Sequence, residues 1–294
     1  MYRCLYKDGE MVLSENSITP DEREVMINGE CAKPGEDINE NKVELITFET
    51  IVKLKDCSYL FHNFVNLKEI QNLHLLDTSE CIRMDAMFAY CFSLKELDLS
   101  KLDTSKVKYM DYMFCNCRSL KSLNLQNLNT AQVEKMDSMF FHCETLKELD
   151  LSSFDTSNVK TMDYMFCACS NLKKLNIQSF DTANVIDMSR MFNGCEKLEI
   201  LELNHFNTSN VITMDYMFCA CSKVKVLNLT SFDMTNVFII NRLFHFCNSL
   251  KQLKLPNTFK TLENSIFLNC YSLKTIEWKN HIYSLKDVET YQSF

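Results

Sequence analysis

Cysteine is the residue type in this chain that could most readily supply chemistry, and the chain holds 15 of them. Six of them form three Cys-x-Cys pairs, which begin at Cys115, Cys167 and Cys219. Thiolates bind zinc and act as nucleophiles, so these pairs are candidates for a metal site or a catalytic thiol. Their chemistry depends on the elements that position them.

The cysteines belong to a repeat that organises most of the chain. Leucine and phenylalanine keep the same step of 26 residues, as Leu149 and Leu175 or Phe140 and Phe166 illustrate. A matching column, whose last step shortens to 23, holds Cys91, Cys117, Cys143, Cys169, Cys195, Cys221, Cys247 and Cys270. Fixed apolar columns at such a period are typical of a solenoid, whose units bury their core against one another.

One unit, residues 146–171, indicates what each segment forms. Leu149 to Leu151 alternates apolar and polar residues, which predicts a short strand with one buried face. Asp155 to Asn158 is a cluster of turn-forming residues. Residues 159–169 place apolar side chains on one helical stripe. The sequence therefore predicts an α/β repeat solenoid of leucine-rich type, with a parallel sheet of about nine short strands on one face and short helices on the other.

Repeat boundaries divide the chain into three parts. We expect residues 43–276 to form the solenoid, residues 1–42 an N-terminal cap and residues 277–294 a C-terminal cap. Caps are needed because an end unit would otherwise expose its core. Alternate units resemble each other more than neighbours do, which indicates that the array grew by copying a pair of units.

The repeat makes a structural role of the cysteines the better interpretation. Stacked rung on rung, the Cys91–Cys270 column predicts a ladder of buried, reduced thiols, although rungs roughly 5 Å apart would permit disulfides by distance. Successive Cys-x-Cys pairs then lie two rungs, roughly 10 Å, apart, too far for one tetrahedral zinc ion. The six histidines are scattered, and no catalytic triad or phosphate-binding loop occurs. We predict no catalytic residue, no metal and no cofactor.

Charge and hydropathy limit the partners further. The net charge is −8, and no block of lysine or arginine occurs, so we expect no nucleic-acid partner. No run of 18 apolar residues predicts a membrane span, and the N-terminal sequence has no stretch of signal-peptide type. We expect a monomer that is cytoplasmic, or exported by a route that the sequence does not reveal.

The repeat resembles the BspA-type leucine-rich repeat family. Residues 146–169 match its pattern of Leu-x-x-Leu-x-Leu-Ser-x-Phe-Asp-Thr-Ser followed by Met-x-x-Met-Phe-x-x-Cys, and residues 253–276 resemble its shorter, 23-residue version. The match covers about residues 55–276. The resemblance implies a surface or secreted protein that adheres to host proteins or to other microbes.

Two surfaces are candidates for protein binding. The first is the outward column of the strands, which holds Asp98, Asn124, Asp150, Asn176, Glu202 and Asn228. The second lies on the opposite side and holds Tyr112, Tyr164, Arg190, Tyr216 and Arg242. Solenoids bind through the extended surfaces that stacking creates, and tyrosine and arginine are enriched at interface hot spots. The alternatives are an ordinary solvated sheet face and tyrosines that only cover the core.

Function follows from these surfaces as an expectation. The leading hypothesis is a non-enzymatic protein-binding protein that recognises host or cell-surface proteins in adhesion, as the resemblance implies. The alternative is an intracellular scaffold or inhibitor that docks a protein partner on the strand face. Reduced cysteines favour that alternative, because disulfides form in oxidising compartments.

Overall fold

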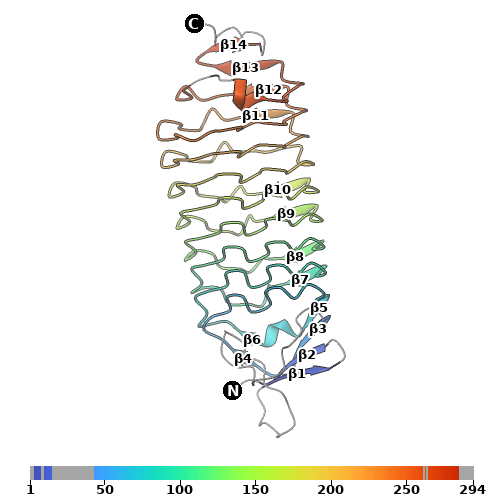
Figure 1. Ribbon diagram of the computed structural model, residues 1–294. Coiled ribbons are helices and arrows are strands. Elements are labelled where there is room, and N and C mark those ends of the chain that lie inside the picture. Colours follow the sequence, from blue (N-terminus) through green and yellow to red (C-terminus); the bar gives the residue numbers. More distant parts are fainter. Residues whose placement is uncertain (1–2, 8–9, 15–42, 261, 263, 285–294) are drawn as a thin grey trace.

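The computed structural model describes residues 3–7, 10–14, 43–260, 262 and 264–284, the first two stretches by their backbone alone. The chain coils into an elongated solenoid of about nine turns, with the strands stacked along one edge from the N-terminal to the C-terminal end (Figure 1). The predicted leucine-rich solenoid with parallel strands is confirmed.

Short strands occupy the position that the Leu-x-Leu pattern predicts. Leu97 lies opposite Leu123, and Leu149 opposite Leu175, so the same leucine of each unit stacks in register. Most of these leucines are buried, and the residues before and after them face solvent. The strands of the stack are β3 (Leu45–Phe48), β5 (Glu69–Gln71), β7 (Glu96–Asp98), β8 (Ser122–Asn124), β9 (Glu148–Asp150), β10 (Lys174–Asn176), β11 (Val226–Asn228), β12 (Gln252–Lys254) and β13 (Thr275–Trp278).

Antiparallel hairpins lie at both ends of the stack. Near the N-terminus, β1 (Arg3–Lys7) pairs with β2 (Glu10–Ser14), which runs parallel to β3. At the other end, β14 (His281–Tyr283) turns back along β13. Two small strands, β4 (Val52–Lys53) and β6 (Leu76–Asp77), pair beside the first coils. Much of both predicted caps lies outside the described residues, so the cap boundaries remain predictions.

The short helices expected opposite the strands are a wrong prediction. Within the described residues, the helices are two 3-10 turns, η2 (Leu73–Leu75) and η3 (Asn264–Phe267). In the unit containing Phe166, every second backbone N–H donates to a carbonyl of the next coil, as Phe166 does to Met191 at 2.9 Å. The N–H groups between them donate to the carbonyl three residues back in the same coil, as Cys167 does to Tyr164 at 2.9 Å. A helix would keep all these bonds within itself.

Left-handed backbone conformations produce this pattern. Tyr164 has φ 56° and Ala168 φ 61°, and the equivalent residues of neighbouring units share the conformation. Two left-handed residues per unit reverse the chain repeatedly, which no α-helix accommodates. The apolar stripe that suggests a helix thus faces the core from a series of turns, which we call the turn face (residues 161–169 and their equivalents).

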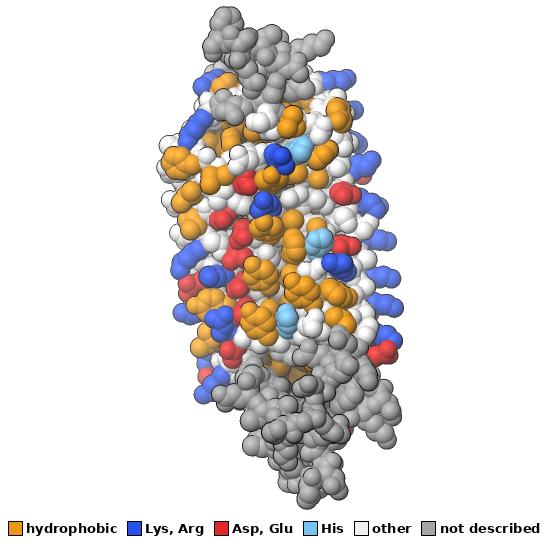
Figure 2. Space-filling view, viewed as in Figure 1, with side chains coloured by type: hydrophobic (Ala, Val, Ile, Leu, Met, Phe, Trp, Pro, Cys, Tyr) orange, Lys and Arg blue, Asp and Glu red, His pale blue; other side chains and the backbone are white. Residues whose placement is uncertain are grey.

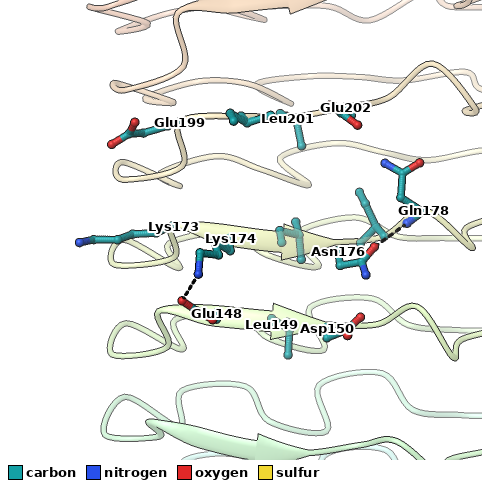
Figure 3. Close-up of a pocket in the computed structure, with 13 residues that line it drawn as sticks. Glu148, Leu149, Asp150, Lys173, Lys174, Asn176, Gln178, Glu199, Leu201 and Glu202 are labelled. Atoms are coloured by element: carbon teal, nitrogen blue, oxygen red, sulfur yellow. Dashed lines mark hydrogen bonds and ion pairs between the residues drawn. The ribbon is translucent and has the colours of Figure 1, made fainter.

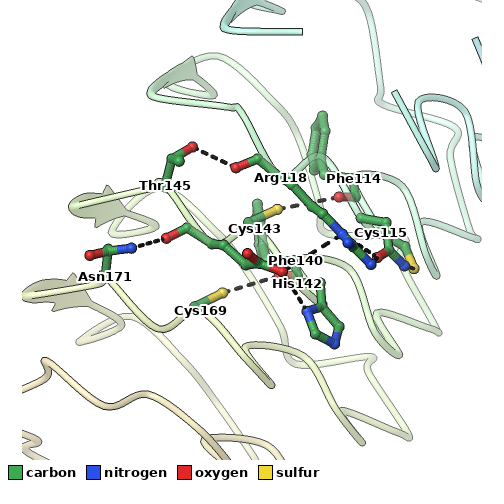
Figure 4. A network of polar contacts seen from close by, with 11 residues as sticks. Phe114, Cys115, Arg118, Phe140, His142, Cys143, Thr145, Cys169 and Asn171 are labelled. Atoms are coloured by element: carbon green, nitrogen blue, oxygen red, sulfur yellow. Dashed lines mark hydrogen bonds and ion pairs between the residues drawn. The ribbon is translucent and has the colours of Figure 1, made fainter. Parts of the chain in front are cut away.

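Two ladders fill the core behind the turn face. Phenylalanines stack from Phe88 to Phe267, with Phe140, Phe166 and Phe192 at centroid distances of 5.7 Å. Beside them, each ladder thiol donates to a phenylalanine carbonyl of the preceding coil; Cys143 to Phe114 and Cys169 to Phe140 are 3.2 and 3.1 Å (Figure 4). Every coil is therefore tied to its neighbour by apolar stacking and by sulfur hydrogen bonds.

The Asp-Thr-Ser-Asn cluster forms the predicted turn and also links the coils. The Asp155 carboxylate accepts the N–H of Ser157 at 3.0 Å, which closes the turn. The Thr156 hydroxyl donates to the Asp181 carbonyl of the next coil at 2.8 Å, and the Asn158 amide donates to Ala131 of the previous one at 2.7 Å.

Candidate protein-binding surfaces

The outward column of the strands faces solvent, where the sequence places it, but most of its members also have a local structural role. Asp150 accepts the N–H of Ser152 at 3.0 Å, and Asn176 accepts that of Gln178 at 3.3 Å. Asp98, Asn124 and Asn228 make the same bond. Backbone and hydroxyl donation from Ser152 lowers the pKa of Asp150. These side chains therefore fix the end of each strand while remaining on the surface.

Glu202 is the exception in this column. Its side chain is one methylene longer, and no hydrogen bond to the backbone two residues on is found for it among the described residues. Its segment, residues 199–202, is also the one coil between β7 and β13 in which no strand forms. In neighbouring coils an Asp or Asn side chain closes the strand end by a bond to the backbone. Here the Glu202 side chain makes no such bond among the described residues and is exposed to solvent.

A depression lies on the strand face around this coil. Its volume is about 690 Å³, and β9, β10 and residues 199–202 line it (Figure 3). Lys174 spans part of it to reach Glu148 at 2.6 Å. A second hollow, of about 410 Å³, continues from residues 199–204 toward β11. Both hollows thus adjoin the coil in which no strand forms.

Two exposed apolar side chains project from adjacent coils at this place. Ile200 is 71% exposed and Val226 is 48% exposed. Equivalent positions in neighbouring coils hold polar side chains, namely Glu148, Lys174 and Gln252. With Glu199 and Glu202 beside them, the pair forms an apolar spot with a charged rim, which is the usual composition of a protein-binding hot spot. We call Ile200, Val226 and Glu202 the strand-face spot.

On the turn face, the predicted tyrosines and arginines come together as one stack. The Arg190 guanidinium lies over the Tyr164 ring at 5.0 Å and over the Tyr216 ring at 4.7 Å, and it donates to the Tyr164 hydroxyl. Arg242 lies over the other side of Tyr216 at 5.7 Å. Tyr112 stands apart, with Ser138 between it and Tyr164, and is 45% exposed. The cations are engaged with rings of the same column, which leaves them less available to a partner.

A column of aspartates beside this stack was not recognised from the sequence. Asp111, Asp137 and Asp163 occupy the same position of successive coils and are half-buried. Burial, and then the neighbouring Asp137 carboxyl, raise the pKa of Asp163 to about 7. Burial also raises the pKa of Asp111 and Asp137. The recurring Met-Asp-x-Met-Phe motif could have revealed this column in the sequence. A helical interpretation of the segment does not predict that the aspartate side chains lie partly inside the turns.

The thiols of the Cys-x-Cys pairs are buried, and burial opposes the ionisation that catalysis by a thiol requires. The thirteen cysteines from Cys57 to Cys270 are free and buried. Burial raises the pKa of Cys167 to about 12 and raises the pKa of Cys115 and Cys219. A protonated, enclosed thiol is a weak nucleophile and a poor metal ligand. Among the described residues, no cluster of three or more histidine, cysteine or acidic side chains is arranged to hold a metal ion.

Comparisons with known proteins connect the chain to one family. The model of the family described as "Mycoplasma protein of unknown function, DUF285" matches residues 55–175 and 136–258. No curated protein matches the sequence. Among the described residues, no helix has the length and apolar character needed to cross a bilayer.

Among solved structures, leucine-rich repeat proteins are similar to this chain. A leucine-rich repeat protein from Bacteroides ovatus is similar with a TM-score of 0.53 and 19% identity, over 95% of this chain and 74% of that one. A leucine-rich repeat protein from Eubacterium ventriosum has a TM-score of 0.36 and 17% identity, over 96% and 97% of the two chains. The first likeness supports the leucine-rich repeat fold, and neither identity is high enough to transfer a function.

Proposed function

The chain belongs to the DUF285 family, and from that premise we propose that it is a non-enzymatic protein whose strand face binds another protein. Leucine-rich neighbours suggest a protein-binding repeat protein in general terms. The observation that carries the proposal is the strand-face spot, where Ile200 and Val226 are exposed side by side above a hollowed, charged surface.

Physical reasons favour this spot over the rest of the surface. Apolar side chains gain most from burial in an interface, and a polar rim excludes water and fixes orientation. At the neighbouring coils, Asp150 and Asn176 are already bonded to the backbone, whereas Glu202 projects without such a bond among the described residues. The spot therefore has both an apolar anchor and an uncommitted charge.

The finer role that we propose is adhesion. The repeat motif resembles that of BspA-type proteins, which supports recognition of a host or cell-surface protein. The alternative role is an intracellular scaffold or inhibitor that would use the same face. Free cysteines do not separate the two, because all thirteen are enclosed and would be protected in an oxidising medium.

Two linked measurements test the proposed role. The labelled chain is added to intact mammalian epithelial cells, and saturable binding is measured before and after trypsin treatment of those cells. Adhesion to a surface protein predicts binding that trypsin abolishes. In parallel, intact producing cells are treated briefly with protease. A chain that stays whole until lysis, together with no binding to the epithelial cells, would contradict adhesion and support the intracellular role.

A further inference from the structure

A row of lysines runs along the edge of the solenoid where the strands begin. From the β7 coil to the β13 coil, the position one residue before each strand holds Lys95, Lys121, Lys147, Lys173, Lys225, Lys251 and Lys274. All seven are exposed. We call them the lysine row. Figure 2 shows lysine and arginine side chains at successive heights along the edge on which Figure 1 places the strands.

The amines of the lysine row have no acidic partner in the described part of the chain. Lys68, at the same position before β5, is paired with Glu44 before β3, so the lysines without an acidic partner begin at Lys95. Lys174, one position further along the chain than Lys173, is paired with Glu148. Figure 3 shows the difference within one coil, because Lys174 turns toward Glu148 whereas the adjacent Lys173 extends away from the strand. On the opposite edge of the solenoid, formed by loops, the lysines have acidic partners: Lys106 binds Glu80 at 2.8 Å and Lys160 binds Glu134 at 2.6 Å.

Spacing makes the lysine row a linear site. Coils are separated by about 4.8 Å, so the row spans roughly 34 Å from Lys95 to Lys274. Neighbouring amines therefore lie within the Debye length of roughly 8 Å at physiological salt, and they repel one another. A chain of anionic groups laid along the row would remove that repulsion and gain from several contacts at once.

Between Lys95 and Lys274, Glu199 is the one residue at this position that is not lysine. It projects from the same end of its coil as Lys173 does from β10 (Figure 3). It divides the row into four lysines before it and three after it. This single negative charge allows the site to be tested by substitution. Replacing it with a positive charge should give one uninterrupted row of cations.

From this arrangement we infer that the lysine row binds a sulfated polysaccharide. A line of charges fits a linear polyanion. Lysine is a point charge that accepts any oxyanion, whereas planar arginine forks, which favour bidentate phosphate contacts, are absent from the row. No aromatic residue occupies the row or the strand position next to it. Proteins that bind single-stranded nucleic acid combine a basic groove with aromatic side chains that stack on the bases.

The inference goes beyond the proposed protein binding, because it concerns another class of ligand and the edge that adjoins the strand-face spot. The test uses immobilised heparin and the full chain, with affinity measured from low to physiological salt. Wild-type protein is expected to bind at physiological salt and to lose affinity steeply as salt rises. Failure to bind heparin at physiological salt would overturn the inference and would leave the strand-face proposal intact.

Matched variants locate the binding. The triple variant Lys121→Gln, Lys147→Gln and Lys173→Gln should weaken heparin binding by roughly tenfold or more, and Glu199→Lys should strengthen it several-fold. The control triple Lys106→Gln, Lys108→Gln and Lys160→Gln changes the net charge equally on the loop edge and should alter affinity by less than about twofold. Equal losses in both triples would mean that net charge, not the row, governs binding.

A competitor decides the class of polyanion. Single-stranded oligo(dT) is compared with heparin for displacement of the chain from the same surface. The inference expects heparin to compete at much lower concentration. Tighter competition by oligo(dT), lost in the same lysine-row triple, would identify nucleic acid as the ligand and overturn the assignment to a polysaccharide. Thermal unfolding of each variant verifies that the fold is retained.

Discussion

The strand face and the turn face arise from the same repeat, yet their polar side chains have different partners. On the turn face, thiols, arginines and tyrosines contact residues of the neighbouring coil, as the Arg190 contacts with Tyr164 and Tyr216 illustrate. On the strand face, the outward carboxylates and amides bond within their own coil, and the contacts between coils are exposed ion pairs such as Lys174 with Glu148. Substitutions on the turn side should therefore change stability, and substitutions on the strand face should change binding.

The largest expected effect comes from the phenylalanine stack that supports the turn face. Phe166→Ala removes a ring packed between Phe140 and Phe192 at 5.7 Å from each, and it should lower the free energy of unfolding by about 3–5 kcal/mol. The strand-face control Val226→Ala should change it by less than about 0.5 kcal/mol. Chemical denaturation measures both. Similar losses would mean that the two faces do not differ as described.

The thiol ladder should give the next largest effect. Cys169→Ser replaces a fully buried thiol that donates to the Phe140 carbonyl at 3.1 Å, and we expect a loss of about 1–3 kcal/mol. Cys167→Ser alters a thiol at the margin of the core, 7% exposed, and should cost less. Equal, small losses in chemical denaturation would contradict the structural role of the ladder.

The aspartate column predicts a pH dependence. Asp163 has a pKa of about 7 against an ordinary value of 3.8. Between these values only the unfolded chain loses the proton, so the contribution of Asp163 to stability is complete below about pH 4 and is lost as the pH rises through 7. Asp163→Asn should therefore stabilise the protein at pH 8 by about 1–2 kcal/mol, after allowance for partial exposure, and change little at pH 4.

Asp155 provides the control of opposite sign. Hydrogen bonds from Ser157 lower the pKa of Asp155, so its contribution is present above the unfolded pKa and is lost in acid. Asp155→Asn should destabilise at neutral pH and have less effect at pH 3. Thermal unfolding across the pH range measures both variants. A stabilisation by Asp163→Asn that is the same at pH 4 and pH 8 would show that ionisation is not its cause.

The smallest expected effect concerns the coil that interrupts the sheet. Glu202→Asn introduces the side chain that closes the strand end at Asn176 and Asn228, and it should stabilise by about 0.5–1 kcal/mol. Amide hydrogen exchange of residues 199–203 should slow accordingly. Unchanged exchange and stability would mean that the side chain at this position does not determine strand formation.

The sequence predicted the solenoid, its parallel strands and its stacked core because these depend on columns of constant residue type. The Cys169 and Phe166 positions repeat at 26 residues over most of the array and occupy matching places in successive coils. The helices were wrong because the apolar stripe of residues 159–169 fits a helix and a series of turns equally well. The deciding factor, hydrogen bonding to the next coil, is a tertiary contact without a local signal.

The surfaces were harder to predict than the core. The sequence predicted that the outward column of the strands faces solvent. It did not predict the hydrogen bonds of these side chains to the backbone, because those bonds depend on side-chain geometry. The strand-face spot comes from departures from the repeat, since Ile200 and Val226 replace polar residues. The lysine row escaped notice because its members are 26 residues apart for most of its length and form no continuous basic block. Periodic columns of surface residues need the same search as columns of core residues.

Recognition by the strand face is tested by measuring the binding of face-specific variants to intact epithelial cells. The double variant Ile200→Glu and Val226→Glu changes the strand-face spot. The control pair Ile186→Glu and Ile212→Glu makes the same change at isoleucines that are 45% and 46% exposed, about halfway round each coil. The account predicts at least a tenfold loss of cell binding for the first pair and no more than about twofold for the second. Equal losses, or a larger loss in the control pair, would contradict recognition by the strand face.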